Sequence, residues 1–331
     1  MCKRGPLGKA RASWQWNNFL ASLARAGQPV LHVNMDETSL KLHVGARPGL
    51  VMEACPKKRR RLLRQGGGPP LKMRRSAVTL VAFACDDRRL QKVLPQVFVV
   101  NEHVVAKAVV AELSERWPGN LHVLRRKSSW VNSAVAVEVV NSLAASLQDV
   151  LRSHLVILHI DAYGAHIQPE FLKACAKVSI IAHLIPASMT PWLQPLDVAV
   201  FSKLKGWVVS EVERQRLAAP SGCLSATEML EIYRRAVQEV LQESDWRSAF
   251  LHTGLRGQHG VSGRLLARLG YTSPPEISSN LPSYTDLQVI FPAGRNIPIE
   301  ELFEAAIAKR KASEALRLPL RARLPPLFEL L

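Results

Sequence analysis

Cysteine is sparse in this sequence and is never paired at short spacing. The five cysteines are Cys2, Cys55, Cys85, Cys175 and Cys223. Because they form no C-x-x-C pair, neither a zinc knuckle nor a disulfide framework is indicated. Long apolar runs are also missing: none reaches the roughly 18 residues needed to span a bilayer, and the N-terminus lacks the apolar core of a signal peptide. These absences predict a soluble intracellular protein without membrane partners.

Acidic side chains are outnumbered. Asp and Glu total 27 against 44 Lys and Arg, which gives a net charge of +17 and a sequence pI near 10.1. Such an excess is typical of proteins with a polyanionic partner, and nucleic acid is the first candidate. The alternative is that the charge only aids solubility.

The basic residues are concentrated in one segment, which favours binding over solubility. Residues 56–75, PKKRRRLLRQGGGPPLKMRR, contain no acid, and their Gly and Pro content predicts a solvated loop. Its basic block is typical of a nuclear localisation signal or a phosphate-binding arm. The block consists of Lys57, Lys58, Arg59, Arg60 and Arg61.

Hydrophobic periodicity predicts an α/β arrangement. Strands are expected from residue 30, over 76–85 and over 92–100, then a helix over 132–151, strands starting at 155 and at 178, and a helix over 195–215. The alternation of the first strand changes phase after Asp36, which predicts a bulge or turn near 37–39. Beyond 217 the patterns predict helices, with Ser225 and Glu228 as a capping box. The expected core is a mixed sheet with crossover helices.

Composition divides the chain into three regions. Residues 1–29 form a basic head with a connecting helix, residues 30–217 form the core with its basic loop at 56–75, and residues 218–331 form a helical region with a basic tail.

Three acids stand out within the core. Asp36 lies on the polar face of the first strand, and Asp161 ends the apolar strand ILHI, at the position where ligand sites gather in α/β sheets. Asp197 is the one acid between Glu170 and Glu211. Taken singly, Asp161 could serve only as a turn former and Asp197 as a helix first-turn acid.

Together, the three segments resemble the catalytic core of DDE-superfamily transposases, most closely the pogo and Tigger branch near the mariner group. The matching motifs are NMDET, which contains Asp36, HIDAYGAH, which contains Asp161, and PASMTPWLQPLD, which ends on Asp197. Asp161 and Asp197 are 36 residues apart. The resemblance covers about residues 30–215. It implies an RNase H-like fold, here a mixed β-sheet flanked by helices with a C-terminal helical extension.

The resemblance implies metal-dependent cleavage and strand transfer of DNA. Asp36, Asp161 and Asp197 would hold two Mg²⁺ or Mn²⁺ ions, because carboxylates supply the hard oxygen ligands that these ions prefer. His166 would steady the turn after Asp161 or contact DNA, and Gln194 is a further auxiliary candidate. Glu37 is expected to face away from Asp36, as strand neighbours do, and is interpreted as structural.

DNA and a second copy of the chain are the expected partners, and the nucleus is the expected location. Basic residues outside the loop are candidates for DNA backbone contacts, which bind without sequence preference. They are Arg125, Arg126, Lys127, Lys203 and Lys205.

Three departures from the family pattern support an alternative hypothesis. Ala162 and Ser188 stand where members of this family usually carry Asn, and no helix-turn-helix region is found in the short segment before the first strand. The alternative is a catalytically inactive, domesticated or decayed transposase fragment that binds nucleic acid in the nucleus.

Overall fold

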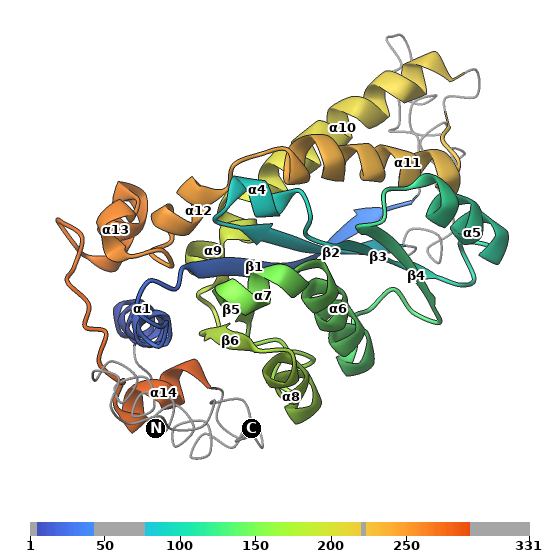
Figure 1. Ribbon diagram of the computed structural model, residues 1–331. Helices are drawn as coiled ribbons and strands as arrows, with labels where there is room; N and C mark the ends of the chain where they lie inside the picture. Colours follow the sequence, from blue (N-terminus) through green and yellow to red (C-terminus); the bar gives the residue numbers. More distant parts are fainter. Residues whose placement is uncertain (1–4, 43–76, 220–222, 292–331) are drawn as a thin grey trace, which may run out of the picture.

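The computed structural model describes residues 5–42, 77–219 and 223–291 (Figure 1). The basic loop at 56–75, with Lys57 to Arg61, and the tail after 291 lie outside the described residues. None of the helices within these ranges is long and apolar enough to cross a membrane.

A six-stranded mixed sheet forms the centre, in the order β4-β3-β2-β1-β5-β6. The strands are β1 (Val30–Lys41), β2 (Ala77–Cys85), β3 (Gln96–Asn101), β4 (Leu121–Arg126), β5 (Leu155–Asp161) and β6 (Ile180–Ile185). β2 is antiparallel to β1 and β3, whereas the pairs β1–β5, β5–β6 and β3–β4 are parallel. The predicted α/β class, a mixed sheet flanked by helices, is confirmed.

Helices cover both faces of the sheet, as Figure 1 shows. On one side lie α6 (Ser133–Ser146), α7 (Gln148–Ser153) and α8 (Pro169–Lys177), and on the other lie α10 (Phe201–Ala218) and α11 (Ala226–Ala236). The remaining elements are α1 (Pro6–Ser22), α4 (Arg88–Gln91), α5 (Lys107–Arg116), α9 (Thr190–Leu193), the π-helical segments η1 (Leu196–Val200) and η2 (Val237–Gln242), α12 (Arg247–His252), η3 (Gln258–Gly260), α13 (Gly263–Leu269) and α14 (Tyr284–Ile290).

The bulge predicted near residues 37–39 is wrong. The β1–β2 pairing runs without interruption from Val33↔Cys85 to Lys41↔Ala77. The sequence changes phase because the strand crosses from one hydrophobic core to another. Val33 and Met35 face the first core, whereas Leu40 faces the second core on the opposite side of the sheet.

Two further predictions needed adjustment at their boundaries. The strand expected from residue 92 begins at Gln96, because Asp87 caps the short helix α4 by accepting from the N–H groups of Arg89 and Leu90. The helix expected over 132–151 divides into α6 and α7 at Leu147. The capping box of Ser225 and Glu228 is confirmed at the start of α11.

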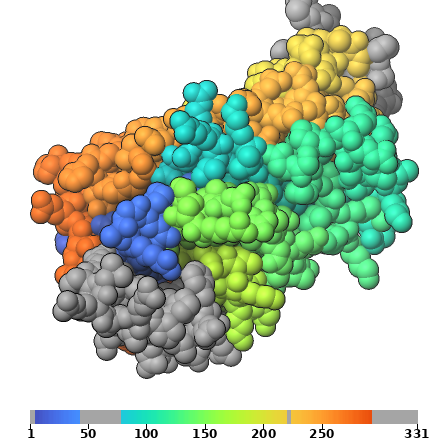
Figure 2. Space-filling model, viewed as in Figure 1, coloured from blue at the N-terminus to red at the C-terminus, as the bar shows by residue number. Residues whose placement is uncertain are grey.

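The N-terminal helix α1 is docked between distant parts of the chain. Figure 2 shows the blue N-terminal segment between the green helices and the orange C-terminal region. Trp14 is fully buried and its Nε1–H donates to the carbonyl of Thr253 (2.9 Å). The side-chain amide of Asn17 donates to the carbonyl of Leu255 (2.7 Å). The helix is therefore part of the folded unit.

Three buried histidines form a hydrogen-bonded chain across the central parallel strands. His32, His159 and His183 come from β1, β5 and β6, and neighbouring rings are joined by nitrogen–nitrogen distances of 3.0 Å. The chain ends where His183 Nε2 contacts the carbonyl of Ser13 (3.1 Å). Because a carbonyl only accepts, Nε2 of His183 carries the proton, and this fixes the donor of each preceding bond. His159 then donates from Nδ1 to His183, and His32 donates from Nδ1 to His159.

These hydrogen bonds require neutral rings at His159 and His183, because one nitrogen of each ring accepts, and the lowered pKa values agree. Burial, reinforced by the Arg256 charge, lowers the pKa of His32 to about 4. Burial likewise lowers the pKa of His183 to about 4, and the pKa of His159 also lies well below its usual value. Because the unfolded-state pKa is about 6.5, their contribution to stability is complete above about pH 6.5 and is lost as the pH falls toward 4.

We expect nitrogen NMR of the imidazole rings to find His32 and His159 protonated at Nδ1 and His183 at Nε2. None of the three should titrate between about pH 8 and about pH 5. A second proton on His159 or His183 would face a neighbouring N–H, and His32 is buried beside the Arg256 charge. The same protein unfolded in urea serves as the control, in which titration near pH 6.5 returns. A titration midpoint near pH 6.5 for His159 in the folded protein would contradict the hydrogen-bond order assigned to the three histidines.

Candidate active site

Asp36 lies on β1 and is almost completely buried, with 8% of its surface exposed. Its Oδ1 accepts from the backbone N–H of Glu37 (2.8 Å). Burial raises the pKa of Asp36 to about 8, and the charges of Asp197, Glu37 and Asp161 act in the same direction. Asp36 is therefore a carboxyl group whose ionisation is opposed by other acids, an arrangement typical of functional sites.

Asp161 ends the neighbouring parallel strand β5. Because Asn34 pairs with His159 in register, Asp36 and Asp161 lie level with each other two residues further along. Oδ1 of Asp161 accepts from the N–H of Tyr163 (3.2 Å) and from Nδ1 of His166 (2.7 Å). The two acids therefore lie side by side where β5 ends against the middle of β1.

Asp197 reaches the same region from the π-helical segment η1, where it is exposed. Although the residue is exposed, protein atoms around its carboxyl group partly desolvate it, and this desolvation and the charge of Asp161 raise its pKa, while the Lys205 charge opposes the shift. Asn34 holds this segment in place: its Oδ1 accepts from the N–H of Leu196 (2.9 Å) and its Nδ2 donates to the carbonyl of His159 (2.9 Å). One buried amide thus ties together the three elements that carry the acids.

Sequence reasoning missed the role of Asn34. The available signal is its spacing: it lies two residues before Asp36, on the same face of a strand that is otherwise buried. A fully buried Asn at such a position needs partners for its amide. It finds them in β5 and in the segment that leads to Asp197.

His166 is fully buried between two carboxylates. Its Nδ1 lies 2.7 Å from Asp161 Oδ1, and its Nε2 lies 3.0 Å from Glu37 Oε1. Burial alone would lower the pKa of His166, but the Glu37 charge and the hydrogen bonds to Asp161 and Glu37 raise it to about 10. Glu37 alternates away from Asp36 along the strand, as expected, yet it is connected to the site through this histidine.

A family comparison covers most of this region. The chain matches the family model of the DDE superfamily endonuclease over residues 78–250. This chain belongs to the DDE superfamily endonuclease family. The matched part includes Asp161 and Asp197 and begins after Asp36, which the strand register places beside Asp161. The resemblance is confirmed at the level of the family, while the pogo and Tigger branch stays a prediction.

Among solved structures, this DDE chain is similar to the Mos1 mariner transposase. The catalytic domain of Mos1 matches with 14% identity and a TM-score of 0.34, covering 76% of this chain and 97% of that one. The Mos1 catalytic domain with raltegravir and Mn matches with 14% identity and a TM-score of 0.34, covering 77% of this chain and 98% of that one. The Mos1 paired-end complex with the left transposon end matches with 13% identity and a TM-score of 0.35, covering 76% of this chain and 64% of that one. No curated protein sequence matches this chain.

The other auxiliary candidate, Gln194, lies in the interior of the DDE domain. It is fully buried, and neither of its amide atoms has a hydrogen-bond partner among the described residues. The structure therefore does not bring its side chain to the surface that DNA would meet.

Several of the basic candidates are engaged by the protein itself. Arg125 is half-buried and donates to the carbonyls of Val105 (2.9 Å) and Glu102 (2.7 Å). Arg126 forms an ion pair with Glu138. These intrachain partners weaken the case for both arginines as phosphate ligands. Lys57 to Arg61 lie outside the described residues.

The two lysines of α10, Lys203 and Lys205, follow Asp197 closely in the sequence. Lys203 Nζ lies 5.1 Å from the ring centroid of Trp246, and Lys205 Nζ lies 5.6 Å from that of Phe201. The Lys205 charge also lowers the pKa of Asp197, which opposes the upward shift. Lys205 therefore acts electrostatically on one of the three acids.

The donor chemistry of the three acids fits a hard divalent cation. Asp36 and Asp161 each use Oδ1 in hydrogen bonds, and no described residue bonds to Oδ2 of either acid. Mg²⁺ prefers such oxygen ligands and keeps several waters, so it does not need every acid in direct contact. Within the described residues, however, no three acidic, histidine or cysteine side chains are drawn together into a ready-made metal site.

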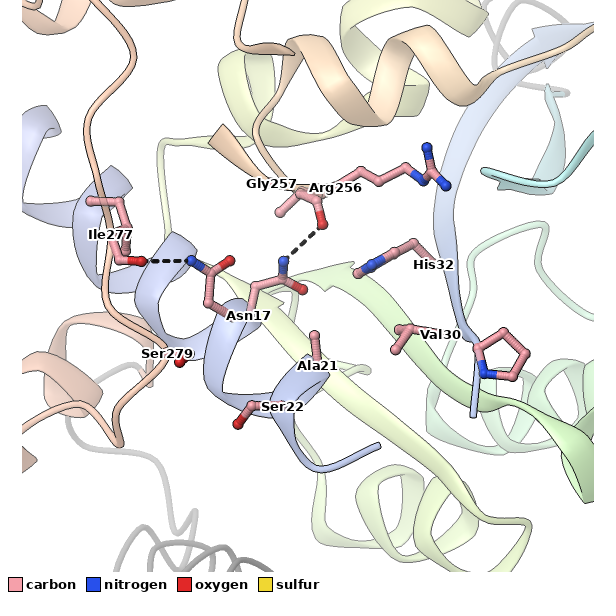
Figure 3. Close-up of a pocket in the computed structure, with 12 residues that line it drawn as sticks. Asn17, Ala21, Ser22, Val30, His32, Arg256, Gly257, Ile277 and Ser279 are labelled. Carbon is pink, nitrogen blue, oxygen red and sulfur yellow. Dashed lines mark hydrogen bonds between the residues drawn. The ribbon is translucent and has the colours of Figure 1, made fainter. Parts of the chain in front are cut away.

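A pocket of about 700 Å³ lies away from the acids, at the start of β1. Figure 3 shows Asn17 and Ser22 of α1 on one side, Val30 and His32 of β1 on another, and Arg256 above them. The Arg256 side chain is held by Asp86 (2.7 Å). The pocket contains none of the three carboxylates and is separate from the candidate active site.

Proposed function

We propose that this DDE-family chain is a metal-dependent DNA endonuclease that also transfers DNA strands, as transposases do. The observation that carries the proposal is the placement of Asp36, Asp161 and Asp197: the strand register sets Asp36 level with Asp161, and Asn34 ties the segment of Asp197 to β1. The charges of Asp161 and Asp197 also raise the pKa of Asp36. The net charge of +17 supports a polyanionic substrate. Nuclear localisation and homodimer formation remain predictions.

The proposed roles follow from the environment of each acid. Asp36, whose pKa is raised to about 8 by burial and neighbouring acids, would release its proton on binding a divalent cation. Asp161 is held at Oδ1 by two hydrogen bonds and would bind the cation through Oδ2. Asp197 would supply the third carboxylate from η1. A bound Mg²⁺ or Mn²⁺ would neutralise phosphate charge and lower the pKa of an attacking water.

Nicking of supercoiled plasmid DNA tests this function. The purified chain is expected to nick DNA when Mg²⁺ or Mn²⁺ is added and to stop when the metal is chelated. The Asp161→Asn variant is the control, because it keeps the shape of the side chain and removes the charge. Nicking by the unmodified chain that does not exceed this control would rule out the proposal.

A second candidate function is DNA binding without cleavage. The observations that favour it are Ala162 after the second acid and the lack of a ready-made metal group within the described residues. Binding that weakens steeply with salt and persists in chelator, with no metal-stimulated nicking, would support this second function.

A further inference from the structure

His166 links Glu37 to Asp161 by two hydrogen bonds, an arrangement called the bridge below. Both carboxylates accept hydrogen bonds when ionised, so His166 donates from both ring nitrogens and carries a positive charge. The ring also contacts Tyr163 edge-on at 5.7 Å and Phe171 at 5.5 Å, measured between centroids. Because the ring is fully buried and bonded at both ends, it cannot turn without losing a hydrogen bond.

The bridge restricts Asp161 directly. Oδ1 of Asp161 receives two donors, the Nδ1–H of His166 and the backbone N–H of Tyr163, so rotation of the carboxylate would break both bonds. The other oxygen is thereby kept free and oriented. Asp161 is about a quarter exposed, in contrast to the buried Asp36, so without the bridge it would have more freedom to turn toward solvent.

Glu37 supplies the far anchor of the bridge. Its side chain is 17% exposed and reaches His166 from the sheet face opposite to Asp36. Two neighbouring residues of one strand therefore act on the site in different ways. Asp36 faces the other acids, and Glu37 holds the histidine that holds one of them.

We propose that Glu37 and His166 are positioning residues that fix Asp161 for divalent metal binding. This inference rests on the proposed function, because it assumes that Asp161 is a metal ligand. Hydrogen-bonding partners of metal ligands orient them, and their removal costs about 10- to 100-fold in metal affinity or activity.

The test compares Glu37→Ala, Glu37→Gln and the unmodified chain. Glu37→Ala is expected to raise the Mn²⁺ concentration for half-maximal nicking about 10- to 100-fold, with a smaller loss of rate at saturating Mn²⁺. Glu37→Gln keeps a hydrogen-bond acceptor and should recover much of the loss. Glu231→Ala is the matched control, since Glu231 is a partly exposed glutamate ion-paired with Arg234 on α11.

Mn²⁺ binding without DNA, followed by the loss of the free-ion electron paramagnetic resonance signal, separates this inference from the proposed function. If the unmodified chain binds Mn²⁺ but does not nick DNA, the proposed function fails, and weaker binding by Glu37→Ala still supports the bridge. Equal Mn²⁺ affinity of a folded Glu37→Ala variant and the unmodified chain overturns it. A chain that binds no Mn²⁺ overturns both.

Discussion

Asp36→Asn is expected to lower metal-dependent nicking by about a thousandfold. Asn preserves the size of the side chain and one oxygen, but it lacks the negative charge that would hold a cation between the other two acids. Loss of charge stabilisation of several kcal/mol is expected for such a ligand, and about 4 kcal/mol corresponds to a factor of about 1,000 in rate. The measurement is the initial nicking rate at saturating Mg²⁺.

The same substitution should not weaken the fold. The pKa of Asp36 is raised from 3.8 to about 8 by burial and by neighbouring acids, so the folded state holds the proton more tightly than the unfolded chain. Stability from this group is therefore complete below about pH 4 and is lost as the pH rises through 8. Asp36→Asn removes that loss, so its metal-free melting temperature at about pH 9 should equal or exceed that of the unmodified chain.

A matched control distinguishes loss of the site from loss of charge. Asp149 lies on α7, with 93% of its side chain exposed, and Asp149→Asn removes one negative charge from the surface. Its nicking rate should stay close to that of the unmodified chain. If Asp36→Asn keeps more than a tenth of the activity, Asp36 is not a ligand of the reacting centre.

The acids could be predicted because each is marked within its own segment. Asp161 ends an apolar strand, and Asp197 stands in a long stretch without other acids. The bridge through Glu37 could not be predicted in this way. It depends on the parallel pairing of β1 with β5 and on the turn after β5 that brings His166 between Asp161 and Glu37. Neither is visible in the local sequence pattern.

Much of the fold followed from periodicity, and the exceptions have physical causes. The change of phase in β1 was interpreted as a bulge because one strand was assumed to face one core, whereas β1 contacts two. The edge strand β4, with pattern LHVLRR, and the helix α5 were not predicted, since both are short and only partly buried. Charge was equally ambiguous: Arg125 and Arg126 look like phosphate ligands in sequence but are bonded within the chain.

Gly254→Ala is expected to destabilise the protein by about 3 kcal/mol. Gly254 has a φ of +77°, where an L side chain costs about 1–2 kcal/mol, and overpacking of a core adds about 1–3 kcal/mol. An added Cβ would lie 2.5 Å from Nε1 and 2.7 Å from Cε2 of Trp14. Trp14 cannot retreat, because it is fully buried and donates to the carbonyl of Thr253. Urea unfolding measures the change.

Gly257→Ala separates backbone strain from the steric clash. Gly257 also has a positive φ, of +89°, but an added Cβ there would meet no atom within 4 Å. It should therefore cost only the backbone part, about 1–3 kcal/mol, since φ +89° with ψ 157° is a conformation that residues with a side chain rarely adopt. Combining Gly254→Ala with Trp14→Leu removes the ring whose Nε1 and Cε2 clash, so the double variant should lose less stability than the two single changes together. Additive losses would show that α1 is not held against residues 253–254 by Trp14.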